Sequence, residues 1–418
     1  MSPVIITLLF LVFAIVMFIL EKIPLGLTAT IVAIGLNITG VLSASDTFAG
    51  YVNSNVILCV GMFVVGQALF ETGMANKIGG IVTRFAKSEH ILITAIMVIV
   101  GVMSGFLSNT GTAAVLIPVV CGIADESGYS RGKLLMPLVF AAALGGNLSI
   151  IGAPGNLMGI DALNNLGIQT SFFEYIAVGA PMLVIGILYF VFIGYKFLPD
   201  TKGEGSAGSQ SDYSSVPKWK QITSLIVLIV VILAMISEDQ IGVKLQVSAC
   251  IGAAFLVLTG VISEKAALQS IDLKVVLLFG GSLALAKALE TTGAGSLIAD
   301  TIVDALGENP NPIILLLVIF IVGCTLTNFM SNTATTALMV PIAASLAQSL
   351  GADPRSMVIA TVISCSCAYA TPIGMPANTM VVGLGGYKFN DYVKSGLPLI
   401  GVSFVICMVL LPILYPFY

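Results

Sequence analysis

Long apolar stretches follow one another along the whole chain, separated by short polar loops. A helix needs about 20 apolar residues to cross the roughly 30 Å hydrocarbon core of a bilayer. Such stretches lie near residues 3–20, 25–42, 54–72, 91–107, 109–124, 133–162, 175–198, 219–237, 244–262, 274–289, 312–330, 333–348, 356–384 and 395–417. The pattern predicts an all-α polytopic membrane protein.

The composition agrees with this prediction. Hydrophobic residues make up 57% of the 418-residue chain and charged residues 9%, whereas soluble domains carry roughly a quarter charged residues. The 7 cysteines all lie in apolar stretches and are predicted to be small buried side chains. The only histidine is His90, so the chain lacks the histidine-based arrangements of metal sites and catalytic triads. It also has no basic stripe for nucleic acid.

The basic residues indicate the orientation of the chain, because Lys and Arg resist crossing the membrane and collect on the cytoplasmic side. We assume an outside N-terminus and let 91–124 and 312–348 each leave on the side where they enter. The inside loops then hold Lys22, Lys77, Arg84, Lys87, Arg131, Lys133, Lys196, Lys202, Lys218, Lys220, Lys265, Lys274, Lys388 and Lys394, and the outside loops only Lys244, Lys287 and Arg355. The opposite orientation inverts this ratio. We therefore predict an inner-membrane protein with ten crossings, two helical pairs and both termini outside.

The chain divides into two similar halves. Residues 108–118 (SNTGTAAVLIP) match 331–341 (SNTATTALMVP) at six of eleven positions, with an offset of 223. Each half contributes five crossings, so the second half must be inverted relative to the first. We predict a first inverted repeat at 1–198, a flexible cytoplasmic linker at 199–218 and a second inverted repeat at 219–418. Inverted repeats of this kind are typical of secondary transporters.

A second motif pair is GNLSIIGAPGN at 146–156 and AYATPIGMPAN at 368–378. Pro and Gly break a helix that would otherwise span the membrane, and broken segments at corresponding places point to a midplane site. The best alignment pairs 152–154 with 370–372 at offset 218, because the later Pro181 and Pro398 agree with it at 217. The alternative pairs 154–156 with 376–378 at offset 222.

The Ser-Asn-Thr motifs stand in apolar sequence, where polar groups are costly unless satisfied. One copy would suggest helices joined by hydrogen bonds, but two equivalent copies favour a site. Hydroxyl and carboxamide oxygens suit Na⁺, and helix N–H groups suit an anion. The ionisable residues of the spans lie near segment ends and are predicted to be interfacial: Glu71, Asp161, Asp272 and Glu290. Without buried carboxylates a proton-driven mechanism is disfavoured.

At these motifs the chain resembles the divalent anion/sodium symporter family, part of a wider group that includes arsenite and Na⁺/H⁺ carriers. The resemblance rests on the two Ser-Asn-Thr motifs, on GAPGN at 152–156 and on residues 370–398, and it covers both halves. It implies two re-entrant helical hairpins with Ser-Asn-Thr at their tips and two broken helices. It also implies a homodimer in which a transport part moves as an elevator against a dimerising scaffold.

The site residues follow from this resemblance, carried over motif by motif. One Na⁺ site would use Ser104, Ser108, Asn109 and the backbone at Gly152. A second Na⁺ site would use Thr327, Ser331, Asn332 and the backbone at Ala370. Substrate carboxylates would meet Asn109, Thr110, Asn332, Thr333, Thr371 and Pro372. Where family members commonly have Thr or Ser followed by Pro-Pro, this chain has 153–155 as Ala-Pro-Gly, so one hydroxyl is missing from the first-half site.

The sequence therefore predicts Na⁺-coupled symport of a di- or tricarboxylate, or of a similar divalent oxyanion such as sulfate. An exchanger of the same fold stays open, since both mechanisms need an anion site. A cation/proton antiporter would need buried carboxylates, and a channel would not need an inverted repeat. The expected partners are the small anion, membrane lipid and a second copy of the chain, and neither a catalytic residue nor nucleic acid is expected.

Overall fold

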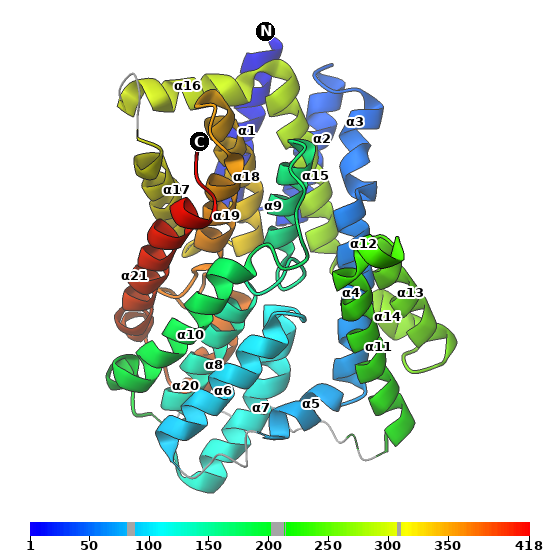
Figure 1. Cartoon of the computed structure of the whole chain (residues 1–418), viewed down its shortest axis with the longest axis vertical. Coiled ribbons are helices and arrows are strands. Elements are labelled where there is room, and N and C mark those ends of the chain that lie inside the picture. Colours follow the sequence, from blue (N-terminus) through cyan, green and yellow to red (C-terminus); the bar gives the residue numbers. More distant parts are fainter. Residues whose placement is uncertain (82–87, 202–212, 214, 307–310) are drawn as a thin grey trace.

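The computed structural model describes residues 1–81, 88–201, 213, 215–306 and 311–418, and these residues fold into helices and connecting loops (Figure 1). Five of the described helices are long and apolar enough to cross a membrane, and five further apolar helices are shorter. The prediction of an all-α polytopic membrane protein is confirmed.

The first half contains a helical hairpin followed by a broken helix. It runs through α1 (Pro3–Leu20), α2 (Leu25–Ile38), α3 (Ala44–Ala49), η1 (Gly50–Val52), α4 (Ser54–Glu71), α5 (Met74–Gly79), α6 (Glu89–Ser104), α7 (Asn109–Ser127), α8 (Arg131–Gly145), α9 (Pro154–Asn165), α10 (Ile176–Phe192) and η3 (Gly194–Phe197). Helices α6 and α7 form a hairpin, and α8 and α9 are the two parts of a broken helix.

The second half also contains a hairpin followed by a broken helix. It runs through α11 (Lys218–Ile236), α12 (Glu238–Ile241), α13 (Leu245–Leu258), α14 (Glu264–Ser270), α15 (Leu273–Thr292), α16 (Ala294–Leu306), α17 (Pro312–Thr327), α18 (Asn332–Ser349), α19 (Pro354–Ser366), α20 (Pro376–Gly385) and α21 (Phe389–Leu414). Here α17 and α18 form the hairpin, and α19 and α20 the broken helix. In Figure 1 the hairpin α6–α7 lies at the lower end with α5, and α17–α18 lies in the upper half beneath α16.

The two halves interlock in the folded chain. Helix α2 packs on α15 and α4 packs on α13, so each of these pairs joins one half to the other. In the same way α9 packs on α18 and α19, and α20 packs on α7 and α8. We call α6–α10 with α17–α21 the hairpin part, and α1–α4 with α11–α15 the outer helices.

The register between the two broken helices differs from the preferred alignment. Helices α9 and α20 both begin at a proline, Pro154 and Pro376, which is offset 222. The Asn156 amide donates to the carbonyls of 146 and 149, and the Asn378 amide donates to those of 368 and 371. The pairing at offset 218 is therefore wrong and the alternative at 222 is correct. The later offset of 217 misled the alignment because the loop after α20 is shorter than the loop after α9.

Most of the predicted linker, 202–212 and 214, lies outside the described residues. Its first residues are docked on the start of α8. The Thr201 carbonyl accepts hydrogen bonds from Ser130 Oγ at 2.8 Å and from the Gly132 N–H at 3.0 Å. Lys133 forms an ion pair with Asp200 at 3.0 Å. The chain thus leaves the first half from a fixed point.

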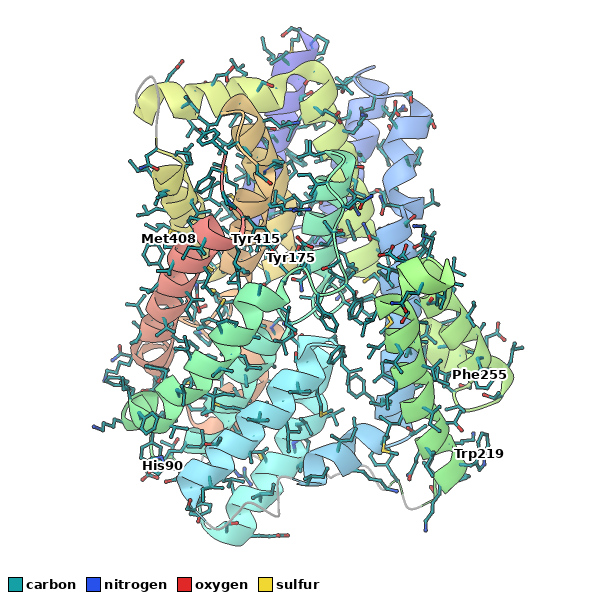
Figure 2. All side chains as sticks on the ribbon, viewed as in Figure 1. His90, Tyr175, Trp219, Phe255, Met408 and Tyr415 are labelled. Atoms are coloured by element: carbon teal, nitrogen blue, oxygen red, sulfur yellow. The ribbon has the colours of Figure 1, made fainter. Side chains whose placement is uncertain are left out.

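The outer surface of the helices is apolar (Figure 2). Exposed Ile, Leu and Val side chains recur on α1, α11 and α21, and the labelled Trp219 and Phe255 lie on the outside of α11 and α13. Such a surface fits lipid or another protein rather than water. Six cysteines are buried as predicted, but Cys250 on α13 is exposed, because α13 turns that face outward.

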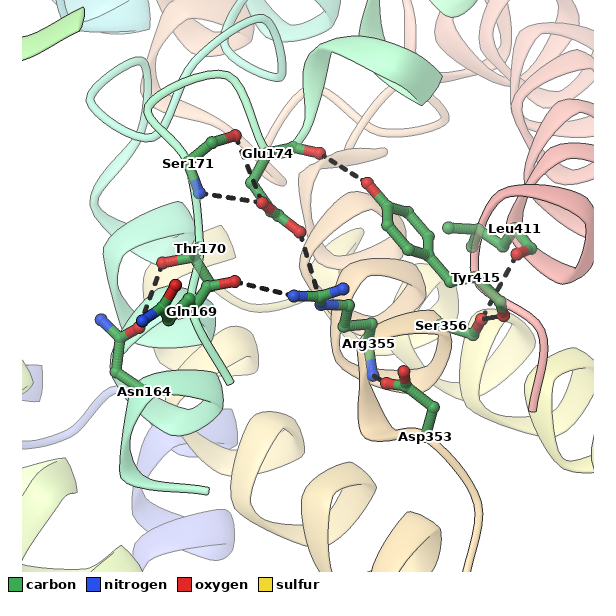
Figure 3. Close-up of polar contacts among 10 residues, drawn as sticks. All are labelled: Asn164, Gln169, Thr170, Ser171, Glu174, Asp353, Arg355, Ser356, Leu411 and Tyr415. Atoms are coloured by element: carbon green, nitrogen blue, oxygen red, sulfur yellow. Dashed lines mark hydrogen bonds and ion pairs between the residues drawn. The ribbon is translucent and has the colours of Figure 1, made fainter. Parts of the chain in front are cut away.

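A polar cluster joins the two halves beside the C-terminus (Figure 3). Glu174, which is 8% exposed, lies 3.8 Å from Arg355 Nε, and Arg355 Nη2 donates to the Gln169 carbonyl at 2.7 Å. The Ser171 N–H donates to Glu174 at 2.9 Å, and the Tyr415 hydroxyl donates to the Glu174 carbonyl at 3.2 Å. These contacts hold the loop before α10 against the start of α19.

Candidate functional site

The tip of the first hairpin places three polar side chains together. Helix α6 ends at Ser104, and Ser108 caps α7 by accepting the Gly111 N–H at 3.1 Å. The cap starts α7 at Asn109, so its side chain returns to the end of α6. Ser104 Oγ then lies 2.7 Å from Asn109 Oδ1 and 2.7 Å from the Ala142 carbonyl on α8.

These atoms form a group of oxygens, which we call the first oxygen group: Ser104 Oγ, Asn109 Oδ1 and the carbonyls of Ala142 and Gly152. The same end of the Asn109 carboxamide lies 3.1 Å from the Ala142 carbonyl and 3.2 Å from the Gly152 carbonyl. A hydroxyl carries one proton, so Ser104 can donate to only one of its two neighbours. The remaining oxygens face one another.

Two chemical states can relieve this repulsion. If the carboxamide turns over, its Nδ2 comes within hydrogen-bond distance of Ser104 Oγ and both carbonyls, and its two protons can satisfy two of them. If the oxygen stays, a small cation among the four oxygens compensates for their partial negative charges. Carbonyl and hydroxyl oxygens are the ligands that Na⁺ sites in transporters use. The donor set therefore fits Na⁺, and the carboxamide can present the end that each state requires.

The second hairpin repeats this geometry. Thr327 Oγ1 lies 2.8 Å from Asn332 Oδ1 and within hydrogen-bond distance of the Cys365 carbonyl of α19, and its one proton can go to either. Ser331 caps α18 through the Ala334 N–H at 3.2 Å. We call Thr327 Oγ1, Asn332 Oδ1 and the Cys365 carbonyl the second oxygen group. Each of these residues is offset by 223 from its counterpart in the first group, so the structure repeats contacts as well as sequence.

The broken segments are tied to the hairpin tips by further contacts, in which Ser149 and Asn328 were not predicted and Thr371 was predicted as a substrate residue. Ser149 Oγ donates to the Gly105 carbonyl, and Thr371 Oγ1 donates to the Asn328 carbonyl. Asn328 Oδ1 also accepts the Ala370 N–H at 2.8 Å. Offset 222 pairs Ser149 with the predicted Thr371, so the correct alignment would have revealed Ser149 as well. It also makes Gly374, not Ala370, the structural counterpart of Gly152.

Burial separates the predicted residues into two classes. The hydroxyls of Ser104 and Thr327, the Gly152 backbone and Thr371 are buried. The remaining predicted site residues are half-buried: Ser108, Asn109, Thr110, Ser331, Asn332, Thr333, Ala370 and Pro372. Burial does not separate the predicted Na⁺ residues from the predicted substrate residues, because both sets have members in each class. The assignments stay predictions.

Helix ends supply the electrostatics of this region. Ala142 and Cys365 lie near the C-terminal ends of α8 and α19, where the aligned peptide dipoles sum to about half a negative charge. Helices α7, α9, α18 and α20 begin at the same motifs, and N-terminal N–H groups favour an anion. Among the described residues, the two oxygen groups are built from hydroxyls, carboxamides and carbonyls without an ionised side chain.

The predicted interfacial position is wrong for Asp161. Its side chain is buried in α9, 4% exposed, and accepts hydrogen bonds from Asn53, Asn55 and Asn165. The prediction failed because the span breaks at 146–153. Asp161 therefore lies on the buried helix α9 that follows the break, and not at the end of a continuous span. Glu71, Asp272 and Glu290 are exposed at or near helix ends, as predicted.

Comparison with known proteins identifies the family. The sequence profile of the citrate transporters, CitMHS, matches residues 15–362. The chain belongs to the CitMHS family. Relatives of the chain include the sodium-dependent dicarboxylate transporter SdcS of Staphylococcus saprophyticus, 24% identical over 95% of this chain and 83% of that protein. The sodium-dependent high-affinity dicarboxylate transporter 3 of Caenorhabditis elegans is 25% identical over 90% of this chain and 77% of that protein.

An uncharacterized transporter of Haemophilus influenzae is 28% identical over 92% of this chain and 86% of that protein. These matches confirm the resemblance to the divalent anion/sodium symporters. The chain is thus a CitMHS transporter and not an enzyme.

Solved structures support the same fold. The YdaH transporter of Alcanivorax borkumensis matches with a TM-score of 0.68 at 16% identity, covering 99% of this chain and 98% of that one. The MtrF protein of Neisseria gonorrhoeae matches with a TM-score of 0.64 at 14% identity, covering 99% and 95%. At this identity the likeness concerns the arrangement of helices alone.

Proposed function

We propose that this CitMHS transporter carries a di- or tricarboxylate, or a similar divalent oxyanion, into the cell together with Na⁺. The observation that carries the proposal is the pair of oxygen groups, which repeat the same hydroxyl, carboxamide and carbonyl contacts at one offset. In each group the C-terminal end of a broken helix and the tip of a hairpin contribute oxygens to one Na⁺. The names of the curated dicarboxylate transporters support the substrate class.

The charge balance explains why the anion would need the cation. A doubly charged anion held by neutral groups alone would face a large desolvation cost. Bound Na⁺ offsets that cost, and the helix N-termini beside it complete the anion surface. Asn109 and Asn332 belong to both sets, so one carboxamide contacts the ion and the substrate together.

Movement of the hairpin part against the outer helices would carry the site across the membrane. Both hairpins and both broken helices pack together through the α9–α18 and α7–α20 contacts. We propose that they move as one body in an elevator cycle, that the two halves are inverted repeats, and that the outer helices form a homodimer. The termini would face the outside of the inner membrane.

Uptake into proteoliposomes tests the proposal, with succinate, citrate and sulfate supplied one at a time. Uptake should require outside Na⁺ and should be faster with an inside-negative potential if net positive charge enters. Each net charge gains about 2.3 kcal/mol per 100 mV, which is roughly a fifty-fold bias in accumulation. Uptake that ignores Na⁺ and voltage but needs an internal anion would replace symport by exchange. Uptake driven by a pH gradient alone would favour proton coupling.

A further inference from the structure

Asp161 has a role that the proposed ion and substrate groups do not explain. Its Oδ1 accepts hydrogen bonds from Asn53 Nδ2 at 2.7 Å and from Asn55 Nδ2 at 3.2 Å. Its Oδ2 accepts one from Asn165 Nδ2 at 3.1 Å. Carboxylates are almost never fully buried without partners. The three carboxamide N–H groups therefore stabilise a buried carboxylate that apolar neighbours alone could not.

The donors come from two different parts of the molecule. Asn165 lies on α9, on the same helix as Asp161, whereas Asn53 and Asn55 lie at the start of α4 among the outer helices. Asn53 also caps α4, since its Oδ1 accepts the Asn55 N–H at 2.8 Å. The cap fixes the orientation of the carboxamide, so that its Nδ2 points at Asp161. The contact therefore joins the hairpin part to a rigid point of the outer helices.

A cavity of about 450 Å³, lined by polar and apolar residues alike, lies beside this contact. Outer-helix residues such as Asp46, Asn53 and Ser282 line one side, and α9 and α18 residues such as Asn165 and Gln348 line the other. The cavity thus follows the boundary between the two parts. Water in it could hydrate the carboxylate when the carboxamides withdraw, which lowers the cost of breaking the contact.

We propose that Asp161 with Asn53 and Asn55 forms a latch that stabilises this conformation, and that the latch opens each time the hairpin part moves. The inference rests on the two-part movement in the proposed function. Hydrogen bonds to an ionised group are about twice as strong as neutral ones, so two of them bias the populations of the two conformations. Carboxamides carry no charge, so the latch can release without separating an ion pair.

The test measures the two conformations directly. Spin labels at Ser45→Cys on α3 and Gln169→Cys beyond α9, both exposed positions, report the distance between the parts by double electron–electron resonance in nanodiscs. Cys250, the exposed native cysteine, is replaced by Ser. Asp161→Asn should lower the population ratio in favour of this conformation about tenfold. Asn165→Ala is the matched control, because it removes a bond to the same carboxylate within one helix, and it should leave the ratio within about twofold.

A donor–acceptor swap separates a latch from general damage. Asn53→Asp keeps the helix cap but places a second carboxylate against Asp161, so it should shift the ratio further than Asp161→Asn. In the double variant Asn53→Asp/Asp161→Asn, the carboxamide at 161 can donate to the carboxylate at 53, so the hydrogen bond forms in the opposite direction. The population ratio should then return to within about threefold of wild type. If Asn53→Asp does not elute as folded protein in gel filtration, the comparison of the population ratios in Asp161→Asn and Asn165→Ala tests the latch by itself.

The outcomes distinguish the latch from the movement on which it depends. If wild type and Asp161→Asn both show two distances, and the populations of these distances have the same ratio in both proteins, the latch is overturned and the transport proposal stays intact. A shift in the folded Asn53→Asp variant that the double variant fails to reverse would also overturn it. A single distance in wild type, with and without Na⁺ and succinate, would remove the two-part movement itself.

Discussion

Removing one hydroxyl from each oxygen group is the most direct test of the Na⁺ sites. Thr327→Val keeps the shape of the side chain and loses the oxygen that contacts Asn332 and the Cys365 carbonyl. Ser104→Ala does the same in the first group. The hydroxyl has one proton, so only one hydrogen bond is lost, but a buried carbonyl loses a partner and the ion loses a ligand. Together these effects amount to about 1.5–3 kcal/mol.

That free energy corresponds to a roughly ten- to hundredfold higher Na⁺ concentration for half-maximal uptake. Uptake of labelled succinate into proteoliposomes, measured over a series of Na⁺ concentrations with choline as replacement, gives this value. The matched control is Thr325→Val, which removes a hydroxyl from the exposed face of α17 that bonds the Ile321 carbonyl of the same helix. We expect the control to behave as wild type. At saturating Na⁺ the preference among succinate, citrate and sulfate should change little in any of the variants.

The reasoning would be refuted if both Ser104→Ala and Thr327→Val kept the wild-type Na⁺ dependence while remaining folded. The oxygens would then hold hairpins to broken helices without touching an ion. A rise in Na⁺ requirement in the Thr325→Val control to the same extent would also refute it, because the effect would then follow helix α17 as a whole.

Asn109→Ala and Asn332→Ala should each abolish uptake while the protein still elutes as folded, because each carboxamide is proposed to contact both ion and substrate; wild-type uptake would return the motifs to a purely structural role. Gly145→Ala should destabilise the fold by about 3 kcal/mol, since its Cβ would overlap the Gly101 backbone where α6 crosses α8, whereas Gly401→Ala has open space and should not lower the melting temperature. Tags at both termini should react with impermeant reagents in whole cells, and labelling only after lysis would contradict the orientation.

The helical order and both breaks could be predicted from the sequence, because hydrophobic length and Pro-Gly motifs are local signals. The segments 133–162 and 356–384 were identified as spans that break, and the structure has α8–α9 and α19–α20 there. What failed was the register of the second motif pair. It depended on loop length after the break, and a loop can lose residues without altering the helix that precedes it.

The candidate site was predictable in its hairpin residues and less so in its partners. Hydroxyl and amide side chains stand out in apolar sequence, but backbone carbonyls such as those of Ala142 and Cys365 carry no sequence signal. Asn328 lacks a polar counterpart in the first half, where Gly105 occupies its place, so the repeat could not single it out. Asp161 was misjudged because its partners Asn53 and Asn55 are more than 100 residues away.

The absence of an ionised side chain from the described contacts of the oxygen groups has a consequence for coupling. Partial charges at helix ends bind a bare cation or a bare dianion weakly, but the two attract each other strongly once both are present. Two opposite unit charges about 4 Å apart gain about 4 kcal/mol at an effective dielectric constant of 20. By linkage, any factor by which Na⁺ raises the affinity for the anion is the factor by which the anion raises the affinity for Na⁺. A site with a fixed arginine would bind the anion alone and could move it without Na⁺. We therefore expect the neutral groups of the proposed site to favour its movement with both ligands or with neither, which is the condition that a symporter must satisfy.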